Sequence, residues 1–495
     1  LTDPTSCGWA SAGPTMVNSS SGPRGDELEK PLLRTEDPHL APEQSTQAVK
    51  QLGARTVLFV LCGVAFTSNV VISLIAPILP VHFKYVGMSQ IWCGVMFSCF
   101  PMAMLLFSPI AVKAMARYGR ALVLFFGLVL QGISSVTFGY ADELTGGTGA
   151  NKTAALVVYT LSRLACGAGG SCANNAIFSI AADRFPDSLA KVMGLNEVVI
   201  GVGFSLGPPI GTAIFLKLGF NIVFLSSGMV ILLFAPFSLL LWQPRTRHHA
   251  SVVIEENQGG LFEVLTPGLL WAGLCVFLGT GVFGVVEPIL GLYLTDEVGV
   301  HPAAVGSIFA VFAVAYSLGG FLAGVLADRV GAMRVVTAGN LAGGLTMLLL
   351  LGPTASLFAK GTPERIWYEV AVLVILGVTQ SGLLIPSLPA MKDSVPGSSP
   401  RVTECVVAWF NMFLQLGLVV GPLLGTAFST TFGFEATVAG FGAAMVAYGF
   451  PAMVVAFRTR AVTGIPTPVN IVTGTHSSPR GFTRKEVTKF EVPSI

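Results

Sequence analysis

The sequence predicts an all-α membrane protein with twelve transmembrane helices arranged as two pseudo-symmetric six-helix bundles. The first observation is composition: 53% of the 495 residues are apolar, 11% are charged, and the mean hydropathy is +0.73. Soluble domains carry about 25% charged residues. The second is a series of apolar stretches long enough to cross the ~30 Å hydrocarbon layer. The third is an internal repeat that relates the two halves of the chain.

Twelve stretches reach the ~20 apolar residues that a membrane-crossing helix needs. In the first half they are 56–82, 91–114, 121–140, 154–181, 190–216 and 220–242. In the second half they are 268–294, 303–327, 334–352, 367–391, 402–429 and 435–457. The predicted regions are therefore a disordered cytoplasmic tail (1–54), a first bundle (55–242), a cytoplasmic loop (243–266), a second bundle (267–457) and a cytoplasmic tail (458–495).

Lys and Arg in the short loops predict how the chain is oriented, because cytoplasmic loops carry the excess of these residues. Fifteen lie in the terminal flanks and the loops on their side, against five on the other side. Both termini are therefore expected in the cytoplasm. The sequon Asn151-Lys152-Thr153 would then lie on the far side, where it could be glycosylated; a chance sequon is the alternative.

Composition and spacing argue against several classes of protein. The net charge is +2 and the basic residues are scattered, so no nucleic-acid partner is expected. The eight cysteines form no C-x-x-C pair and no histidines have zinc spacing, so neither a metal site nor a disulfide framework is expected. No nucleophile–base set or phosphate loop is visible, which predicts no enzymatic activity and no cofactor.

Short motifs recur between the halves at a nearly constant offset. Pro-Ile-Leu at 77–79 recurs at 288–290, 211 residues later. The pattern G-x-x-x-G-P-x-x-G-T at 203–212 recurs at 417–426, 214 residues later, and Gly-Phe follows each copy. Two similar six-helix bundles predict a duplicated transporter fold. In such folds the substrate site lies near the midplane between the halves, which move to expose it alternately.

This layout resembles the major facilitator superfamily, and the loop after the eighth span carries one of its motifs. The segment G-V-L-A-D-R-V-G resembles the interdomain loop motif, in which the Asp and Arg can pair and stabilise one gated state. In the equivalent loop after the second span, Val112 replaces the Gly and Ala116 replaces the Asp. The motif residues are Gly324, Asp328, Arg329 and Gly331.

The fourth span carries Arg163 in the pattern R-x-x-C-G-x-G-G, which resembles the Arg motif of proton-coupled members of the superfamily. An Arg well inside a membrane span is costly, so it marks a candidate functional site. A structural Arg bonded to helix-end carbonyls is the alternative.

The fifth span resembles the antiporter motif of the superfamily. Glycines four residues apart clear one helix face so that a neighbouring helix can approach closely, and the proline bends the helix. Tight packing alone is the alternative. The motif residues are Gly194, Gly203, Gly207, Pro208 and Gly211.

Within the superfamily the chain is most similar to the vesicular amine transporter family. The stretches that carry this are Pro-Ile-Leu-Pro at 77–80, Gly-Pro-Pro at 207–209 and Glu-Pro at 287–288. Monoamine carriers have Asp where this chain has Ser68-Asn69 and Asn411, which argues against a monoamine substrate. Glu197 instead resembles the polyamine-type branch of the family.

Buried charges are the candidate machinery. Glu197 and Glu287 are expected to face the bundle interior, because ionised carboxylates are expensive in lipid. A carboxyl group removed from water favours its protonated form, so a proton and a cation can compete for it. Together with Arg163 these acids are the predicted coupling residues; a structural ion bridge between Glu197 and Arg163 is the alternative. Glu369 and Glu404 are expected at the membrane interface.

Polar and aromatic side chains inside the spans are the candidate lining of a substrate cavity. Amides can hydrogen-bond a ligand, and aromatic rings attract ammonium groups. His82 and His301 lie near the far ends of their spans and could sense acid pH. The predicted cavity residues are Asn69, Asn411, Phe100, Phe204, Tyr316 and Trp409.

The predicted function is a proton-coupled antiporter that moves organic cations, a polyamine or a related amine, by alternating access. The favoured location is a vesicle or another acidic organelle. A plasma-membrane multidrug:proton exporter and a transport-inactive sensor on the same scaffold are the alternatives. The expected partners are a small organic cation, a proton and the lipid bilayer, and the expected state is monomeric.

Overall fold

The computed structural model describes residues 53–185, 188–241, 262, 264–351, 357–397 and 400–463, and all regular structure within these residues is helical. The tails predicted over 1–54 and 458–495 and the loop predicted over 243–266 lie wholly or largely outside the described residues.

The helices follow the apolar stretches that the sequence contains. In the first half they are α1 (Ala54–Ser73), α2 (Ile75–Val86), α3 (Ile91–Tyr118), α4 (Arg120–Gly139), α5 (Ala141–Leu144), α6 (Lys152–Arg184), α7 (Leu189–Leu218), α8 (Phe220–Phe234) and η2 (Ala235–Leu241). In the second half they are α10 (Pro267–Tyr293), η4 (Leu294–Val298), α11 (Pro302–Val330), α12 (Ala332–Leu345), η5 (Thr346–Leu351), α13 (Pro363–Leu384), α14 (Ser387–Asp393) and α15 (Pro400–Thr463).

The twelve-helix fold is confirmed. Ten stretches of the described chain are long and apolar enough to cross a membrane, and the kinked pair α1 and α2 forms one of them. The stretch Val402–Pro451 holds two spans, because Gly433 interrupts α15 with a φ of 82°. The twelfth helix is α6, which has 33 residues but is less apolar because it is rich in Gly and Asn. The exact bundle boundaries remain a prediction.

Paired glycines end equivalent helices in the two halves. Gly119 ends α3 with a φ of 94°, and Gly331 ends α11 with a φ of 99°. A positive φ is readily adopted only by glycine. The glycine of the interdomain loop motif therefore serves, in both copies, to turn the chain sharply into the next span.

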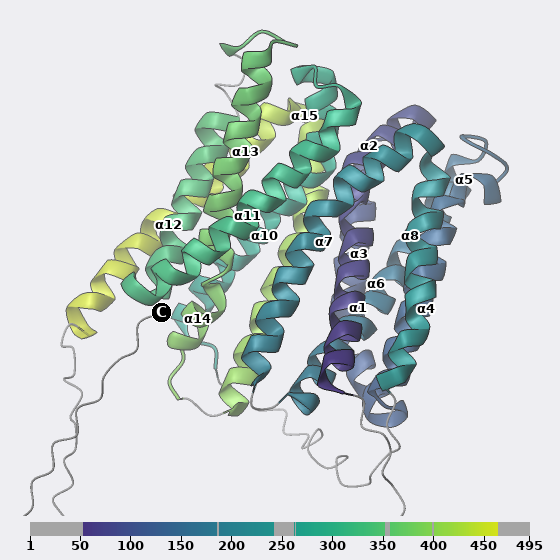
Figure 1. Ribbon diagram of the computed structural model, residues 1–495. Coiled ribbons are helices and arrows are strands. Elements are labelled where there is room, and N and C mark those ends of the chain that lie inside the picture. Colours follow the sequence, from purple (N-terminus) through teal and green to yellow (C-terminus); the bar gives the residue numbers. More distant parts are fainter. Residues whose placement is uncertain are drawn as a thin grey trace, which may run out of the picture. The chain divides into compact units, whose positions relative to one another are not determined.

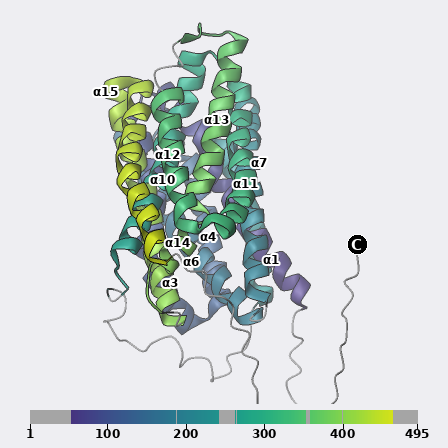
Figure 2. The ribbon, with the colours of Figure 1, turned by 90° about the vertical axis from the view of Figure 1, so that its left-hand side faces the viewer.

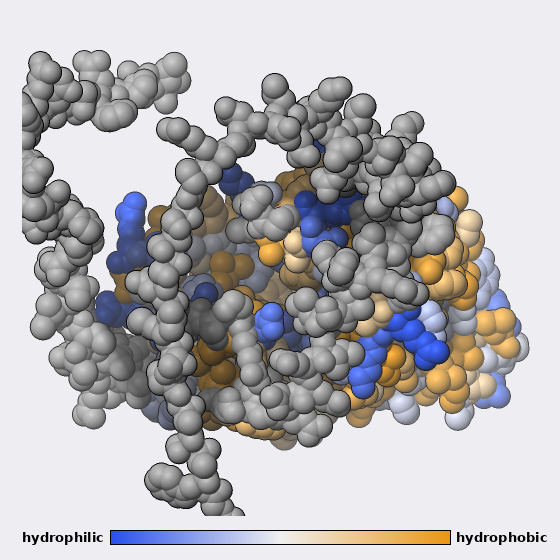
Figure 3. Space-filling model, turned by 90° about the horizontal axis from the view of Figure 1, so that it is seen from below, coloured by the Kyte–Doolittle hydropathy of each residue, from blue (hydrophilic) through white to orange (hydrophobic). Residues whose placement is uncertain are grey.

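Helices of the two halves pack against each other, α3 against α15 and α7 against α11 (Figure 1). Within the second half, α12 lies beside both α13 and α15 (Figure 2). Contacts between the two halves continue to the end of the molecule where the C-terminus of α2 lies, and we call this the α2 end. There Lys84 Nζ of the first half lies 2.5 Å from Asp296 Oδ2 of the second. Figure 3 views the opposite end, where the coloured part of the surface shows hydrophilic patches among apolar ones.

Two glycines let the halves approach closely, and the repeat relates them. A Cβ on Gly94 of α3 would lie 2.5 Å from the carbonyl oxygen of Pro422 in α15. A Cβ on Gly306 of α11 would lie 2.6 Å from the carbonyl oxygen of Pro208 in α7. Each half thus presses a glycine of one helix onto the Gly-Pro motif of the other half, and no larger side chain fits there.

We expect Gly306→Ala to destabilise this arrangement by about 1–3 kcal/mol, the usual cost of forcing an extra group into a packed contact. The measurement is the thermal unfolding of purified protein, which should occur at a lower temperature. Gly440→Ala is the matched control, because a Cβ at Gly440 would meet nothing within 4 Å. Equal unfolding temperatures for the two variants would contradict the prediction.

Candidate functional site

A cavity of about 230 Å³ lies between the two halves. Its wall comes mainly from α1, α3, α4, α6 and α7 of the first bundle, and α10 and α15 of the second bundle complete it. The charged side chains among its described lining residues are Arg163 and Glu287. The cavity therefore places one basic and one acidic group, from opposite bundles, around a space of ligand size.

Arg163 is held in place by the packing of α6 against α3. Its side chain is 6% exposed, and its Nε donates a hydrogen bond to the carbonyl oxygen of Met96 at 3.2 Å. Its guanidinium carbon lies 5.1 Å from the centre of the Phe100 ring. The glycines that follow Arg163 permit this contact, since a Cβ on Gly170 would come within 3.1 Å of Phe100. The Arg motif thus positions the Arg163 guanidinium group, and its glycines leave space for the Phe100 ring beside it.

Glu287 enters the cavity from α10, directly before a proline. Pro288 has no N–H, so the carbonyl of Gly284 loses its helical partner, and Gly284 also lines the cavity. Glu287 interacts electrostatically with Arg163 across the space. A carboxylate and a free carbonyl close to it are two acceptors suited to an ammonium group.

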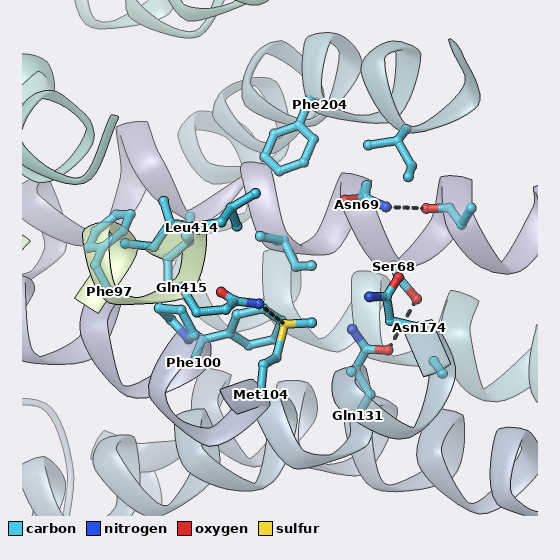
Figure 4. A pocket seen from close by; sticks show the side chains of 18 of the residues that line it. Ser68, Asn69, Phe97, Phe100, Met104, Gln131, Asn174, Phe204, Leu414 and Gln415 are labelled. Carbon is cyan, nitrogen blue, oxygen red and sulfur yellow. Dashed lines mark hydrogen bonds between the residues drawn. The ribbon is translucent and has the colours of Figure 1, made fainter. Parts of the chain in front are cut away.

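The rest of the wall is mainly apolar, and uncharged polar side chains lie among the apolar ones (Figure 4). Ser68 Oγ donates to Gln131 Oε1 at 3.1 Å, and Asn174 lies beside this pair. Asn69 Nδ2 donates to the carbonyl oxygen of Ala65 at 2.7 Å. Within the described part of the chain, Gln131 Nε2 and Asn196 Oδ1 are buried without a hydrogen-bond partner. Since buried polar groups normally find partners, these two atoms are available to a ligand or to water.

Several predicted site residues come together at this cavity. Asn69, Phe100 and Phe204 line it together with Arg163 and Glu287. Glu197 lies on α7 outside the lining residues, and it interacts electrostatically with Tyr316 of α11. Arg163 therefore shares the cavity with Glu287 of the other bundle, whereas the alternative ion bridge would have joined it to Glu197.

Three predicted cavity residues lie outside the lining. The ring of Tyr316 packs edge-on against Phe283, with centroids 5.3 Å apart. The Trp409 ring lies 5.9 Å from that of Phe413. Asn411 is exposed, and its Nδ2 donates to the carbonyl oxygen of Val407 at 2.9 Å. In the conformation described, Tyr316 and Trp409 therefore pack between helices, and Asn411 lies on the exposed surface.

The antiporter-motif glycines pack α7 onto α1. A Cβ on Gly203 would lie 3.1 Å from the carbonyl oxygen of Phe66, and one on Gly207 would lie 2.7 Å from that of Val70. A Cβ on Gly211 would lie 2.9 Å from the Leu74 side chain, whereas Gly194 has open space. The motif therefore fixes the wall helices α1 and α7 at close distance. Asp328 and Arg329 of the interdomain loop motif lie in the last turn of α11, and Gly324 has open space.

Gln131 was not singled out from the sequence, and the burial of Glu369 was not anticipated. Gln131 is fully buried in the cavity wall; its signal was available, because a Gln inside an apolar span is as unusual as the asparagines that were considered. Glu369 was expected at the membrane interface, which stays a prediction; the structure adds that it is 0% exposed and accepts a hydrogen bond from Tyr293. Proximity to a span end does not imply exposure when a neighbouring helix covers the position.

Comparisons with known proteins agree on a family. The family model described as Major Facilitator Superfamily matches residues 61–286 and 269–483. The MFS-type transporter SLC18B1 of Mus musculus is 26% identical, over 80% of this chain and 85% of its own length. The Synaptic vesicular amine transporter of Rattus norvegicus is 23% identical, over 69% of this chain and 62% of its own length.

A bacterial multidrug resistance protein and a solved transporter structure are also similar to this chain. The Multidrug resistance protein MdtG of Escherichia fergusonii is 24% identical, over 80% of this chain and 93% of its own length. The crystal structure of a D323A mutant of the nucleoside transporter NupG superposes with a TM-score of 0.65 at 12% identity, covering 80% of this chain and 99% of that one. The relatives and the fold are those of transporters, and the chain is similar to the vesicular amine transporter family.

We expect Arg163→Lys to reduce transport about ten-fold or more, because a hydrogen bond to a charged group contributes about 1.5–3 kcal/mol. Lysine keeps the charge but lacks the planar group that lies over Phe100 and the Nε that binds Met96. The measurement is initial uptake rate in proteoliposomes. Arg334→Lys, at a half-buried position on α12 outside the cavity lining, is the control for the same exchange. Equal rates for both variants would count against the role of the Arg163 geometry.

Proposed function

This chain belongs to the Major Facilitator Superfamily, and we propose that it is a proton-coupled antiporter that carries an organic cation, a polyamine or a related amine. The observation that carries the proposal is the position of Glu287. It is the acidic side chain among the described lining residues of the cavity, and it shares that space with Arg163, amides and the rings of Phe100 and Phe204.

The proposed exchange follows from the charges in the cavity. With Glu287 ionised, its carboxylate offers an ammonium group a counter-charge, and the aromatic rings add cation–π attraction. When a proton binds Glu287, that counter-charge disappears and Arg163, which stays protonated, repels the cation. A proton and a cation therefore exclude each other, and this exclusion is the requirement for antiport.

Alternating access supplies the second half of the mechanism. The contacts of Gly94 and Gly306 and the ion pair between Lys84 and Asp296 join the bundles at the α2 end. In the proposed cycle these contacts break while the opposite ends of the bundles approach, so that the cavity opens to the other side. The repeat supports this, because each bundle contributes the same kind of glycine contact.

The chain is a multi-pass integral membrane protein, and we place both termini in the cytoplasm and the α2 end in an acidic vesicle or organelle. The excess of Lys and Arg on the side of the termini supports this orientation. The similarity to a vesicular amine transporter supports the compartment. We further propose that the bundles of residues 55–242 and 267–457 act within a monomer.

A plasma-membrane multidrug:proton exporter is the second candidate. The similarity to the Multidrug resistance protein MdtG supports it, and an aromatic cavity with one acid would also suit a lipophilic cation. The third alternative, a transport-inactive sensor, is less favoured because the Gly-Pro contacts are formed in both halves.

The substrate class is tested in proteoliposomes with an inside-acid gradient and three labelled cations: spermidine, serotonin and a cationic dye. Proton-driven uptake of spermidine is expected, and it should disappear when an ionophore collapses the gradient. Transport of the dye alone would favour the multidrug exporter. No proton-dependent uptake of any of the three would refute the antiporter proposal.

We expect Glu287→Gln to lower proton-driven uptake to background, because Gln has the shape of the protonated carboxyl but cannot release a proton. Glu404→Gln, an exposed carboxyl on α15, is the control and should keep wild-type uptake. If Glu197→Gln abolishes uptake while Glu287→Gln does not, the coupling acid is Glu197. Full proton-driven uptake by both of these variants would overturn the mechanism.

A further inference from the structure

A buried polar cluster anchors the end of α2 in the first bundle. The His82 ring is stacked on Phe220 of α8, with centroids 3.6 Å apart and planes at 10°. His82 Nε2 lies 3.0 Å from Asp142 Oδ2 and 3.2 Å from Tyr159 Oη. All four side chains are buried. We call His82, Asp142, Tyr159 and Phe220 the first clasp.

A matching cluster anchors the end of α10 in the second bundle. The Tyr293 ring is stacked on Phe434 of α15, with centroids 3.7 Å apart and planes at 12°. Tyr293 Oη donates a hydrogen bond to Glu369 Oε1 of α13 at 2.6 Å. Arg365 lies one turn before Glu369 on α13 and has its Nη2 3.9 Å from Glu435 Oε1. We call Tyr293, Glu369, Arg365 and Phe434 the second clasp.

The internal repeat relates the two clasps. Tyr293 follows His82 by 211 residues, the offset that also separates the two Pro-Ile-Leu segments, and Phe434 follows Phe220 by 214. Glu369 follows Tyr159 by 210 residues, and each lies on the fourth span of its bundle, α13 and α6. The stacked pair of rings is therefore kept in both halves, whereas the hydrogen-bonding groups beside it differ.

Each clasp lies next to one end of the ion pair that joins the bundles. Lys84 follows His82 by two residues, and Asp296 follows Tyr293 by three. Lys360 also donates to the carbonyl oxygen of Asp296. The position of α2 thus depends on the first clasp, and the position of η4, which carries Asp296, depends on the second. Figure 1 shows α2 at this end of the bundles.

We propose that Glu369 is a proton-binding site separate from the central cavity. A proton bound there weakens the hold on Tyr293 and thereby on η4, whose Asp296 pairs with Lys84 of the first bundle at the α2 end. Glu369 is completely buried, and its Oε2 has no hydrogen-bond partner within the described residues. An ionised carboxylate with a buried, unpartnered oxygen is costly, and a proton on Oε2 removes that charge.

Loss of the charge weakens the hold on Tyr293. A hydrogen bond to an ionised acceptor is about twice as strong as a neutral one, so protonation leaves Tyr293 held mainly by its stacking on Phe434. The charged and titratable groups that face Glu369 are Tyr293, Arg365 and Glu435, and Glu297 of η4 lies near Glu435. With Glu369 neutral, Arg365 retains Glu435 as its acidic partner, so this ion pair can persist while the hydrogen bond from Tyr293 weakens.

The first clasp differs from the second in its buried polar groups. His82 Nε2 lies within hydrogen-bond distance of Asp142 Oδ2 and Tyr159 Oη, and Glu143 lies near Tyr159. The proposed acid response therefore acts through Glu369 and loosens the hold on the end of α10. His301, by comparison, is an exposed cap at the start of α11.

The experiment measures opening of the α2 end without substrate, in purified full-length protein in lipid nanodiscs. Spin labels are placed on Leu144→Cys of the first bundle and Leu357→Cys of the second, which are 65% and 78% exposed. For the wild type we expect a longer label-to-label distance to gain population as the pH falls from about 7.5 to about 5. Glu369→Gln should lose this pH dependence and populate the longer distance at both pH values.

Glu364→Gln is the matched control, an exposed carboxyl on the same helix, and should keep the wild-type response. Retention of the wild-type response by Glu369→Gln, or absence of any response in the wild type, would overturn the proposal. If Glu369→Gln does not fold, Tyr293→Phe decides: it keeps the stacked ring, loses the donor, and should open at neutral pH. Because no cation is present, failure here leaves the cation–proton exchange at Glu287 untouched.

Discussion

The cost of holding charge away from water is the constraint on which the rest of this structure depends. Arg163 and Glu287 can lie inside the membrane span because each lines the same cavity and each interacts electrostatically with the other. The bundles must then be built around that space. Glycines bring α6 onto α3 and α7 onto α1, so that the wall helices surround the two charges closely.

The internal repeat explains why the two bundles meet as they do. Each Gly-Pro motif packs its own glycines on the first helix of its bundle and offers a carbonyl oxygen to a glycine of the other bundle. One short pattern therefore serves both the internal packing of a bundle and its contact with the partner bundle. A movement that separates the bundles at the α2 end breaks two equivalent contacts together, which is the geometry that alternating access needs.

Most of the fold could be predicted from the sequence, because membrane helices are dictated by apolar run length: the stretch 190–216 became α7 at Leu189–Leu218. The cavity charges could also be predicted, since a charge in an apolar run has few explanations. Their partners could not. Whether Arg163 meets Glu197 or Glu287 depends on how the helices rotate and cross, and these follow from packing between bundles. The burial of Glu369 could not be predicted for the same reason, because the helices that cover it are distant in sequence.

The two stacked ring pairs show which property the duplicated positions share. His82 and Tyr293 offer the same flat face to Phe220 and Phe434, yet one side chain can gain a positive charge and the other cannot. Shape and titration behaviour are thus separable at these positions. The duplication therefore leaves two positions that require a flat ring but not the same polar group. A single exchange between aromatic residues at one of them could change the pH at which the transporter works while the packing of both bundles stays the same.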